Sequence, residues 1–172
     1  MKTLDENGLD QLFELIAIKP GTLIVHFCDE DSTFMHKLNT LCEANEYEYQ
    51  VNCIEDTSYE VICKKYKDKP YLKPIKMPLA RPRYLVRAKH YDYLFATFDF
   101  SGQDKAAFLE KCYPIIRTGG EIVILIPKSN YMTQDDWIDT LVEKSYVSIN
   151  IIDNIFENHD VIVAKRMHGW GN

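Results

Sequence analysis

The stretch that decides the fold runs from residue 91 to residue 126 and reads YDYLFATFDFSGQDKAAFLEKCYPIIRTGGEIVILI. It opens with an apolar strand over 91–98 and closes with another over 121–126. Between the two strands, apolar residues recur at helical spacing, which predicts a helix over 104–116 that Pro114 kinks or ends. Two buried strands joined by a helix are the repeating unit of a parallel α/β sheet.

The rest of the chain alternates strand-like and helix-like segments in the same way. Capping residues indicate where helices start: Asn7 before the first helix, and Thr133 with Asp136 as a capping box before the last. Residues 117–120, Arg-Thr-Gly-Gly, are expected to form a turn in which glycine supplies a positive φ. The short break over 153–158 resembles a hairpin, which makes the final two strands antiparallel. The sequence therefore predicts a three-layer, Rossmann-like α/β fold whose sheet is mostly parallel with an antiparallel C-terminal strand.

Size and composition fit a single domain over residues 1–172. The apolar fraction of 46% and the charged fraction of 27% are ordinary for a globular protein. No apolar run approaches the roughly 18–20 residues of a membrane span, and the N-terminus shows no apolar signal core. The five cysteines are odd in number and contain no C-x-x-C pair, which favours reduced thiols in a cytoplasmic protein and indicates no metal site.

Residues 67–90 are the irregular part of the predicted domain. Prolines recur there every four residues, so the segment is expected to be extended, with one short edge strand, and either to wrap a face of the domain or to form a binding arm. Between Lys64 and Lys89 the chain holds ten basic residues against Asp68 alone. This asymmetry indicates an anionic partner or a solvated loop. The candidate partner-binding residues are Lys73, Lys76, Arg81, Arg83 and Arg87, with Tyr71 and Tyr84 for stacking on bases and Trp170, in the tail over 165–172, as an aromatic anchor.

Together, the two quoted strands, the helix and the Gly-Gly turn resemble the second half of class I S-adenosylmethionine-dependent methyltransferases. Tyr91–Asp99 looks like that family's fourth strand, which an Asp opens and an acidic or amide residue closes. Pro114–Ile124 looks like the family's helix-to-strand turn, usually Leu-x-Pro-Gly-Gly, although the proline here stands further from the glycines. The resemblance implies that S-adenosylmethionine would bind above the carboxyl ends of the strands.

The first half of the chain departs from that family in its chemistry. The family's first strand ends in a glycine-rich loop with a leading acidic residue, and the glycines let the backbone approach the cofactor. The matching loop here, residues 26–32, reads HFCDEDS and contains no glycine, so the side chains of Phe27 and Cys28 are expected to occupy space that the methionine moiety needs. The cofactor-binding candidates that the resemblance implies are His26, Cys28, Asp29, Glu30, Glu55 and Asp56, of which the last two would hold the ribose hydroxyls.

Each candidate also has a structural explanation. His26, on a buried strand, is typical of a hydrogen-bonded core histidine, and Glu55 and Asp56 can cap the next helix. Asp99, at the end of a central strand, is the candidate catalytic residue that would orient a nucleophile, or else a cap for the following helix.

Three functions are open on the sequence. The first is a methyltransferase-like domain with a degenerate cofactor loop that binds no cofactor and acts as a non-catalytic subunit or adaptor. The second is an active S-adenosylmethionine-dependent methyltransferase, in which positioning supplies most of the rate. The third is binding of phosphate or nucleic acid through the proline-rich stretch over 67–90, called the basic segment below.

Overall fold

Strands form where β-branched and aromatic residues run together, and those at the centre of the sheet are buried along most of their length. The computed structural model describes residues 4–85 and 89–167. The elements in chain order are α1 (Glu6–Phe13), β1 (Leu23–Cys28), α2 (Thr33–Asn45), β2 (Glu48–Cys53), α3 (Asp56–Lys65), β3 (Leu72–Lys76), β4 (Tyr91–Ala96), α4 (Lys105–Cys112), the 3-10 turn η1 (Tyr113–Ile115), β5 (Ile116–Pro127), α5 (Tyr131–Glu143), β6 (Tyr146–Ile152) and β7 (His159–Arg166).

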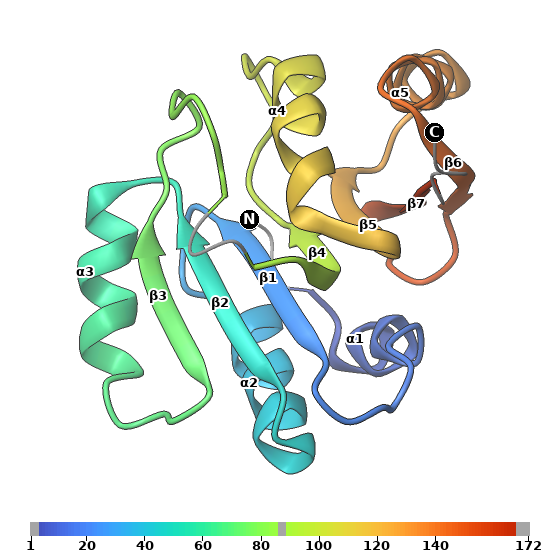
Figure 1. Cartoon of the computed structure of the whole chain (residues 1–172). Helices are drawn as coiled ribbons and strands as arrows, with labels where there is room; N and C mark the ends of the chain where they lie inside the picture. The colour runs from blue at the N-terminus through green and yellow to red at the C-terminus, as the bar shows by residue number, and fades with distance from the viewer. Residues whose placement is uncertain (1–3, 86–88, 168–172) are drawn as a thin grey trace.

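The strands of the described residues form one seven-stranded sheet in the order β3-β2-β1-β4-β5-β7-β6 (Figure 1). The pairs from β3 to β5 are parallel, whereas β7 is antiparallel to both β5 and β6. The predicted Rossmann-like fold with an antiparallel C-terminal strand is therefore confirmed. The chain builds outward from β1 to β3 and then crosses to β4, so the direction of winding switches between β1 and β4. In open α/β sheets, ligands bind at the carboxyl ends of the strands beside such a switch.

Two apolar cores cover the two faces of the sheet. On one face α1, α2 and α3 pack against the strands, with Phe34 in edge contact with Phe13 and Phe95. On the other face α4 and α5 pack against the strands, where Phe27 and Phe108 meet at right angles with ring centroids 5.3 Å apart. Figure 1 shows α4 and α5 on the opposite side of the sheet from α1 and α2.

The connection from β3 to β4 contains no helix in its described residues, 77–85 and 89–90. It covers the second face with side chains instead, since Met77 and Tyr84 are buried in that core. Residues 77–85 thus cover part of a face of the domain, and β3, just before them, is the expected edge strand. The proposed stacking role of Tyr84 is wrong, because its ring packs 4.9 Å from Phe27 and its hydroxyl donates to the carbonyl of Leu79.

Two helix caps differ from the sequence prediction. Asp5, not Asn7, caps α1, and its carboxylate accepts the amide of Gly8 at 2.9 Å. Asn130, not Thr133, caps α5, and its side-chain oxygen accepts the amide of Thr133 at 3.0 Å. In both places a second residue with capping chemistry lies two or three positions earlier, so each helix begins sooner than expected.

Residues 117–120 do not form a separate turn. They belong to β5, which begins at Ile116 and shifts register against β4 near Tyr91. Gly119 has the expected positive φ, 75°, but within this irregular strand pairing. At Gly120 an added Cβ would lie 3.0 Å from the carbonyl oxygen of Asp92, so only glycine fits where β5 passes β4.

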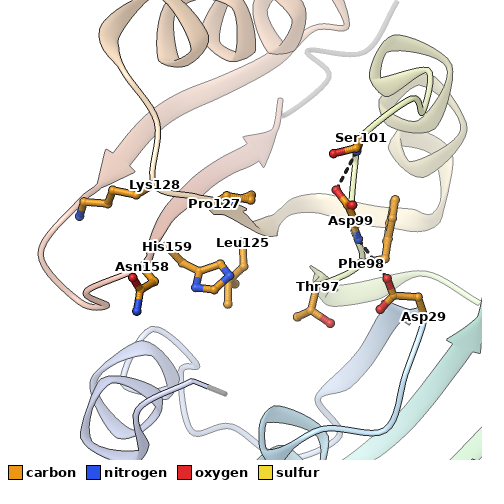
Figure 2. Close-up of a pocket in the computed structure, with 10 residues that line it drawn as sticks. All are labelled: Asp29, Thr97, Phe98, Asp99, Ser101, Leu125, Pro127, Lys128, Asn158 and His159. Carbon is orange, nitrogen blue, oxygen red and sulfur yellow. Dashed lines mark hydrogen bonds between the residues drawn. The ribbon is translucent and has the colours of Figure 1, made fainter. Parts of the chain in front are cut away.

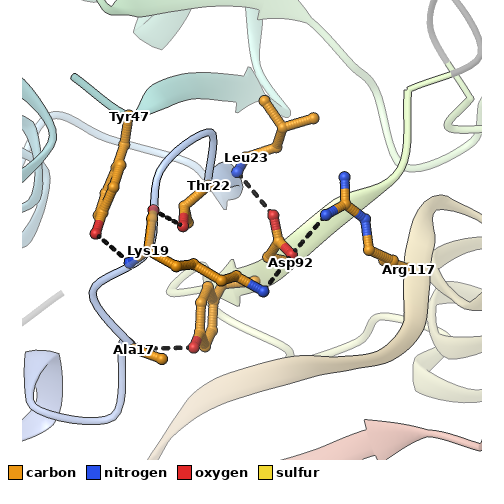
Figure 3. A network of polar contacts seen from close by, with 8 residues as sticks. Ala17, Lys19, Thr22, Leu23, Tyr47, Asp92 and Arg117 are labelled. Carbon is orange, nitrogen blue, oxygen red and sulfur yellow. Dashed lines mark hydrogen bonds and ion pairs between the residues drawn. The ribbon is translucent and has the colours of Figure 1, made fainter. Parts of the chain in front are cut away.

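The carboxylate of Asp92 joins three segments at the amino ends of the strands (Figure 3). Its Oδ2 accepts the amide of Leu23 at the start of β1, at 2.9 Å. Its Oδ1 lies 3.0 Å from both the Arg117 guanidinium and the Lys19 ammonium. The side chain of Asp92 is 4% exposed, whereas those of Lys19 and Arg117 are about half exposed. Through these contacts the buried Asp92 side chain fixes β1, β4 and β5 relative to one another.

Replacement of Asp92 tests this role. We expect Asp92→Ala to lower the free energy of unfolding by about 1–3 kcal/mol, because the Leu23 amide loses its acceptor while the half-exposed cations regain water. Urea denaturation followed by circular dichroism measures the change. Asp139→Ala, at an exposed position of α5, is the control, with an expected change within about 0.5 kcal/mol. Equal stability of the two variants would contradict the role of Asp92.

Candidate functional site

A cavity of about 490 Å³ lies at the carboxyl ends of β1, β4 and β5, beside the first residue of β7 (Figure 2). This is the side of the switch point on which ligands bind in such sheets. Figure 2 shows Asp29 and Asp99 on one side and Lys128, Asn158 and His159 across from them. The lining residues are Asp29, Thr97, Phe98, Asp99, Ser101, Leu125, Pro127, Lys128, Asn158 and His159.

Hydrogen bonds join the strand ends at the switch point. The carbonyl of Phe27 accepts the amide of Thr97 at 3.1 Å, and the carbonyl of Cys28 accepts the amide of Ile54 at 3.0 Å. One residue further, Oδ2 of Asp29 accepts the amide of Asp99 at 3.1 Å. Backbone hydrogen bonds thus join the end of β1 to the residues that follow β2 and β4. The Asp29 carboxylate adds a side-chain link between the loops after β1 and β4.

The remainder of the loop after β1 belongs to helix packing. Asp31 accepts hydrogen bonds from Lys65, at 2.5 Å, and from the Tyr66 hydroxyl, at 2.9 Å. Burial, together with the hydrogen bond to Asp31, raises the pKa of Tyr66. Ser32 caps α2, because its hydroxyl oxygen accepts the amide of Met35. The acidic side chain of Asp31 therefore holds the end of α3 and does not line the described cavity.

His26 and Cys28 are buried in the sheet. Both ring nitrogens of His26 are hydrogen-bonded, Nδ1 to the hydroxyl of Tyr49 at 2.8 Å and Nε2 to the hydroxyl of Thr97 at 2.7 Å. Burial lowers the pKa of His26 to about 3, so the ring is neutral. A hydrogen bond with Cys53 and burial raise the pKa of the Cys28 thiol well above its usual value. These two side chains act in the core and do not reach the cavity.

The acidic residues after β2 are also placed away from the cavity. Asp56 is exposed and lies 3.2 Å from Lys76. Glu55 occupies the capping position of α3, yet within the described structure its side chain makes no capping hydrogen bond. Glu30 is exposed in the loop after β1. In the part of the chain that the structure describes, Asp29 is the only proposed cofactor-binding residue that lines this cavity.

Asp99 lines the cavity and does not cap α4. Its Oδ1 accepts the backbone amide of Ser101 at 2.8 Å, and this hydrogen bond lowers the pKa of Asp99. The cap of α4 is Asp104, whose carboxylate accepts the amide of Ala107. The carboxylates of Asp29 and Asp99 thus stand together at the ends of β1 and β4 and make this side of the cavity acidic.

The opposite wall contains residues that sequence reasoning missed. Lys128 follows β5 directly and His159 is the first residue of β7. Neither belongs to a motif, and their position at strand ends is the only signal that could have found them. Lys128 donates to the backbone carbonyl of Asp153, which ties this wall to the hairpin before β7.

Asp160 fixes that wall in place. Its Oδ2 accepts the amide and hydroxyl of Ser129, at 3.1 and 2.8 Å, and the side-chain amide of Gln134 at 3.1 Å. Burial would raise the pKa of Asp160, but hydrogen bonds from Ser129 and Gln134 outweigh it and lower the pKa. The charged carboxylate therefore holds the loop between β5 and α5, from which Lys128 projects.

The partner-binding candidates that the structure describes do not line this cavity. Lys73 is 3.9 Å from Glu48, and Lys76 pairs with Asp56 beside the ring of Tyr59. Arg81 contacts the sulfur of Met77, and Arg83 is exposed. Arg87 and Trp170 lie outside the described residues.

Across 4–85 and 89–167, no helix combines the length and apolar character that a membrane crossing requires. In the same residues no three histidine, cysteine or carboxylate side chains gather in a way that could hold a metal ion.

Solved structures show which fold this is. No protein-family model and no curated protein matches the sequence. An S-adenosylmethionine-dependent methyltransferase from Aquifex aeolicus superposes with a TM-score of 0.76 at 9% identity, over 92% of this chain and 89% of that chain. An S-adenosylmethionine-dependent O-methyltransferase from Thermotoga maritima gives 0.74 at 10% identity, over 100% and 69%. The methyltransferase domain of the citrinin polyketide synthase gives 0.75 at 14% identity, over 93% and 50%, so this chain spans half the length of that structure.

The neutral state of His26 has a consequence for stability. In the unfolded chain the pKa is near 6.5, so between about pH 6.5 and pH 3 the unfolded state binds more protons and stability falls as the pH falls. When the pH is lowered from about 7 to about 5, we expect the free energy of unfolding of the wild type to fall by about 2 kcal/mol more than that of His26→Gln. Urea denaturation of both proteins at the two pH values measures this difference. The effects of the other histidines cancel because both proteins contain them. Equal losses would contradict a neutral, buried His26.

Proposed function

We propose that this chain, which has the fold of class I S-adenosylmethionine-dependent methyltransferases, is a non-catalytic subunit or adaptor. The observation that carries the proposal is the hydrogen bond from the Asp99 amide to the Asp29 carboxylate across the switch point. This bond lies at the carboxyl ends of β1 and β4, where ligands bind in open α/β sheets, and a cofactor would have to displace it. A fold does not fix a function, so this hydrogen bond and the glycine-free loop weigh more than the likeness to methyltransferases.

The residues present do not fit S-adenosylmethionine in the manner that the resemblance implies. A glycine-free loop keeps side chains at Cys28 and Asp29, and Asp31 is engaged by α3. Among the described residues, the cavity is lined from β1, β4, β5 and β7 but not by Glu55 or Asp56 at the end of β2. A carboxylate that would hold the ribose is therefore separated from the cavity that would hold the rest of the cofactor.

An active methyltransferase is the second candidate, and one observation favours it. The cavity of about 490 Å³ falls in the usual size range of small-molecule sites, and Asp29 and Asp99 give it two carboxylates. Negative charge attracts a ligand that carries sulfonium and ammonium groups. Under this alternative Asp99 would orient the nucleophile, and binding would require the bond between Asp29 and Asp99 to open.

For the adaptor, the proposed partner is an anionic protein or ligand that meets the basic segment. Lys73, Lys76, Arg81, Arg83 and Arg87 remain the candidate contacts, with Trp170 as a candidate anchor. Lys73 and Lys76 would exchange their present carboxylates, Glu48 and Asp56, for those of the partner. Exchange of exposed ion pairs costs little, since such pairs contribute about 0–1 kcal/mol each.

Thermal unfolding with and without S-adenosylmethionine and S-adenosylhomocysteine distinguishes the two candidates. We expect no change in Tm at millimolar ligand, because the loop after β1 has no glycine and the carboxylates after β2, Glu55 and Asp56, do not line the cavity. A ligand at about 100 times its Kd would stabilise the fold by roughly 2.7 kcal/mol, which raises Tm by several degrees. If Tm rises, and the rise is lost in Asp99→Asn but kept in the control Asp139→Asn, the adaptor proposal is contradicted. The active methyltransferase then becomes the preferred candidate.

A further inference from the structure

A second cavity, of about 450 Å³, lies at the opposite end of the sheet. It opens at the amino ends of β1, β4 and β5 and at the last residue of β7. Four of its six lining residues are basic, and the described lining includes no carboxylate. The lining residues are Leu23, Lys89, His90, Arg117, Thr118 and Arg166.

Arg117 is held at this cavity by the Asp92 network. Its Nη1 lies 3.0 Å from Asp92, and the same carboxylate oxygen also meets Lys19 (Figure 3). One negative charge therefore faces two positive charges, so the surroundings of Arg117 retain an excess of positive charge. A guanidinium has five N–H donors, and the contact with Asp92 uses Nη1, which leaves the side chain able to meet a second anion.

Arg166 is equally well fixed. Its Nη1 donates to the carbonyl of Ile116 at 2.6 Å, and the guanidinium lies 4.9 Å from the ring centre of Tyr113. These contacts are to neutral groups, so the charge of Arg166 is not cancelled by them. An arginine that is already ordered loses little conformational freedom when it binds a ligand.

We propose that this cavity binds a phosphate group, free or carried by a small molecule. Arginine forks match the oxygens of a tetrahedral oxyanion, and Arg117, Arg166 and Lys89 approach from three different strand ends. A volume of about 450 Å³ falls within the size range of small-molecule sites. The inference does not depend on the proposed function, because it concerns the other end of the sheet.

A polyanion would need a continuous basic surface, and the basic segment does not supply one next to the cavity. Lys73 and Lys76 face the acidic residues Glu48 and Asp56. Lys89 belongs to that segment and lines the cavity, but its ammonium is also paired with the Glu48 carboxylate. The observations therefore favour a compact phosphate over a nucleic acid.

Titration of the full chain with inorganic phosphate and with ribose 5-phosphate tests the proposal. Calorimetry gives the affinity, and amide shifts of Leu23 and Thr118 in nitrogen-15 NMR spectra give the place. Thr118 is exposed, so Thr118→Glu adds a negative charge to the cavity without removing a buried contact. We expect Thr118→Glu to weaken binding at least about tenfold, and Thr118→Gln, its neutral match, by less than about twofold.

Further measurements distinguish free phosphate from a phosphate ester, and binding in the cavity from binding along the basic segment. Tighter binding of ribose 5-phosphate than of inorganic phosphate would assign the site to a phosphate ester, and equal binding to free phosphate. Arg83→Gln, a charge loss outside the cavity, is expected to change either affinity by less than about twofold. The proposal is overturned if neither compound binds at millimolar concentration, or if Arg83→Gln weakens binding as much as Thr118→Glu. Tight, salt-dependent binding of a random oligonucleotide that Arg83→Gln removes would point to a nucleic acid instead.

Discussion

The buried carboxylate of Asp92 is the contact on which both ends of the sheet depend. It fixes the amino ends of β1 and β5 against β4, through the Leu23 amide and the Arg117 guanidinium. Once the amino ends of parallel strands are aligned, their pairing determines which residues meet at the carboxyl ends. There the carbonyl of Phe27 accepts the amide of Thr97, and the carboxylate of Asp29 accepts the amide of Asp99. The same carboxylate also holds Arg117 at the rim of the second cavity.

The two ends of the sheet differ in charge, and that difference is more informative about function than the fold. The carboxyl end presents Asp29 and Asp99 on one side of a cavity, where the Asp29 carboxylate accepts the amide of Asp99. The amino end presents Arg117 and Arg166 around a cavity that is free of carboxylates in its described lining. The solved structures compared above are S-adenosylmethionine-dependent methyltransferases, yet a shared fold hosts many functions through different sites. Our two proposals therefore rest on the side chains at each end of the sheet and not on the likeness of fold.

Much of the fold could be predicted because apolar runs and glycines act locally. The buried strands, the antiparallel end of the sheet and the positive φ of Gly119 all follow from neighbouring residues. Caps were mistaken where two capping residues stand close together, as with Asp5 and Asn7. The charge pattern of the basic segment concealed the apolar packing of Tyr84. The cavities could not be predicted, because they combine single residues from distant strand ends, and only pairing and register bring those together.

The helix-free connection between β3 and β4 also bears on how the chain folds. Other parallel crossovers in the described sheet carry a helix, whose local contacts can form early and bring the next strand into place. This connection relies on Tyr84 meeting Phe27 and Phe108, residues far from it in the chain. The chain must lose the conformational entropy of closing this loop before these contacts can stabilise it. We therefore expect the halves before and after residue 77 to acquire structure as separate cooperative units, with docking of this segment as the late, slow event, visible as two classes of amide in native-state hydrogen exchange.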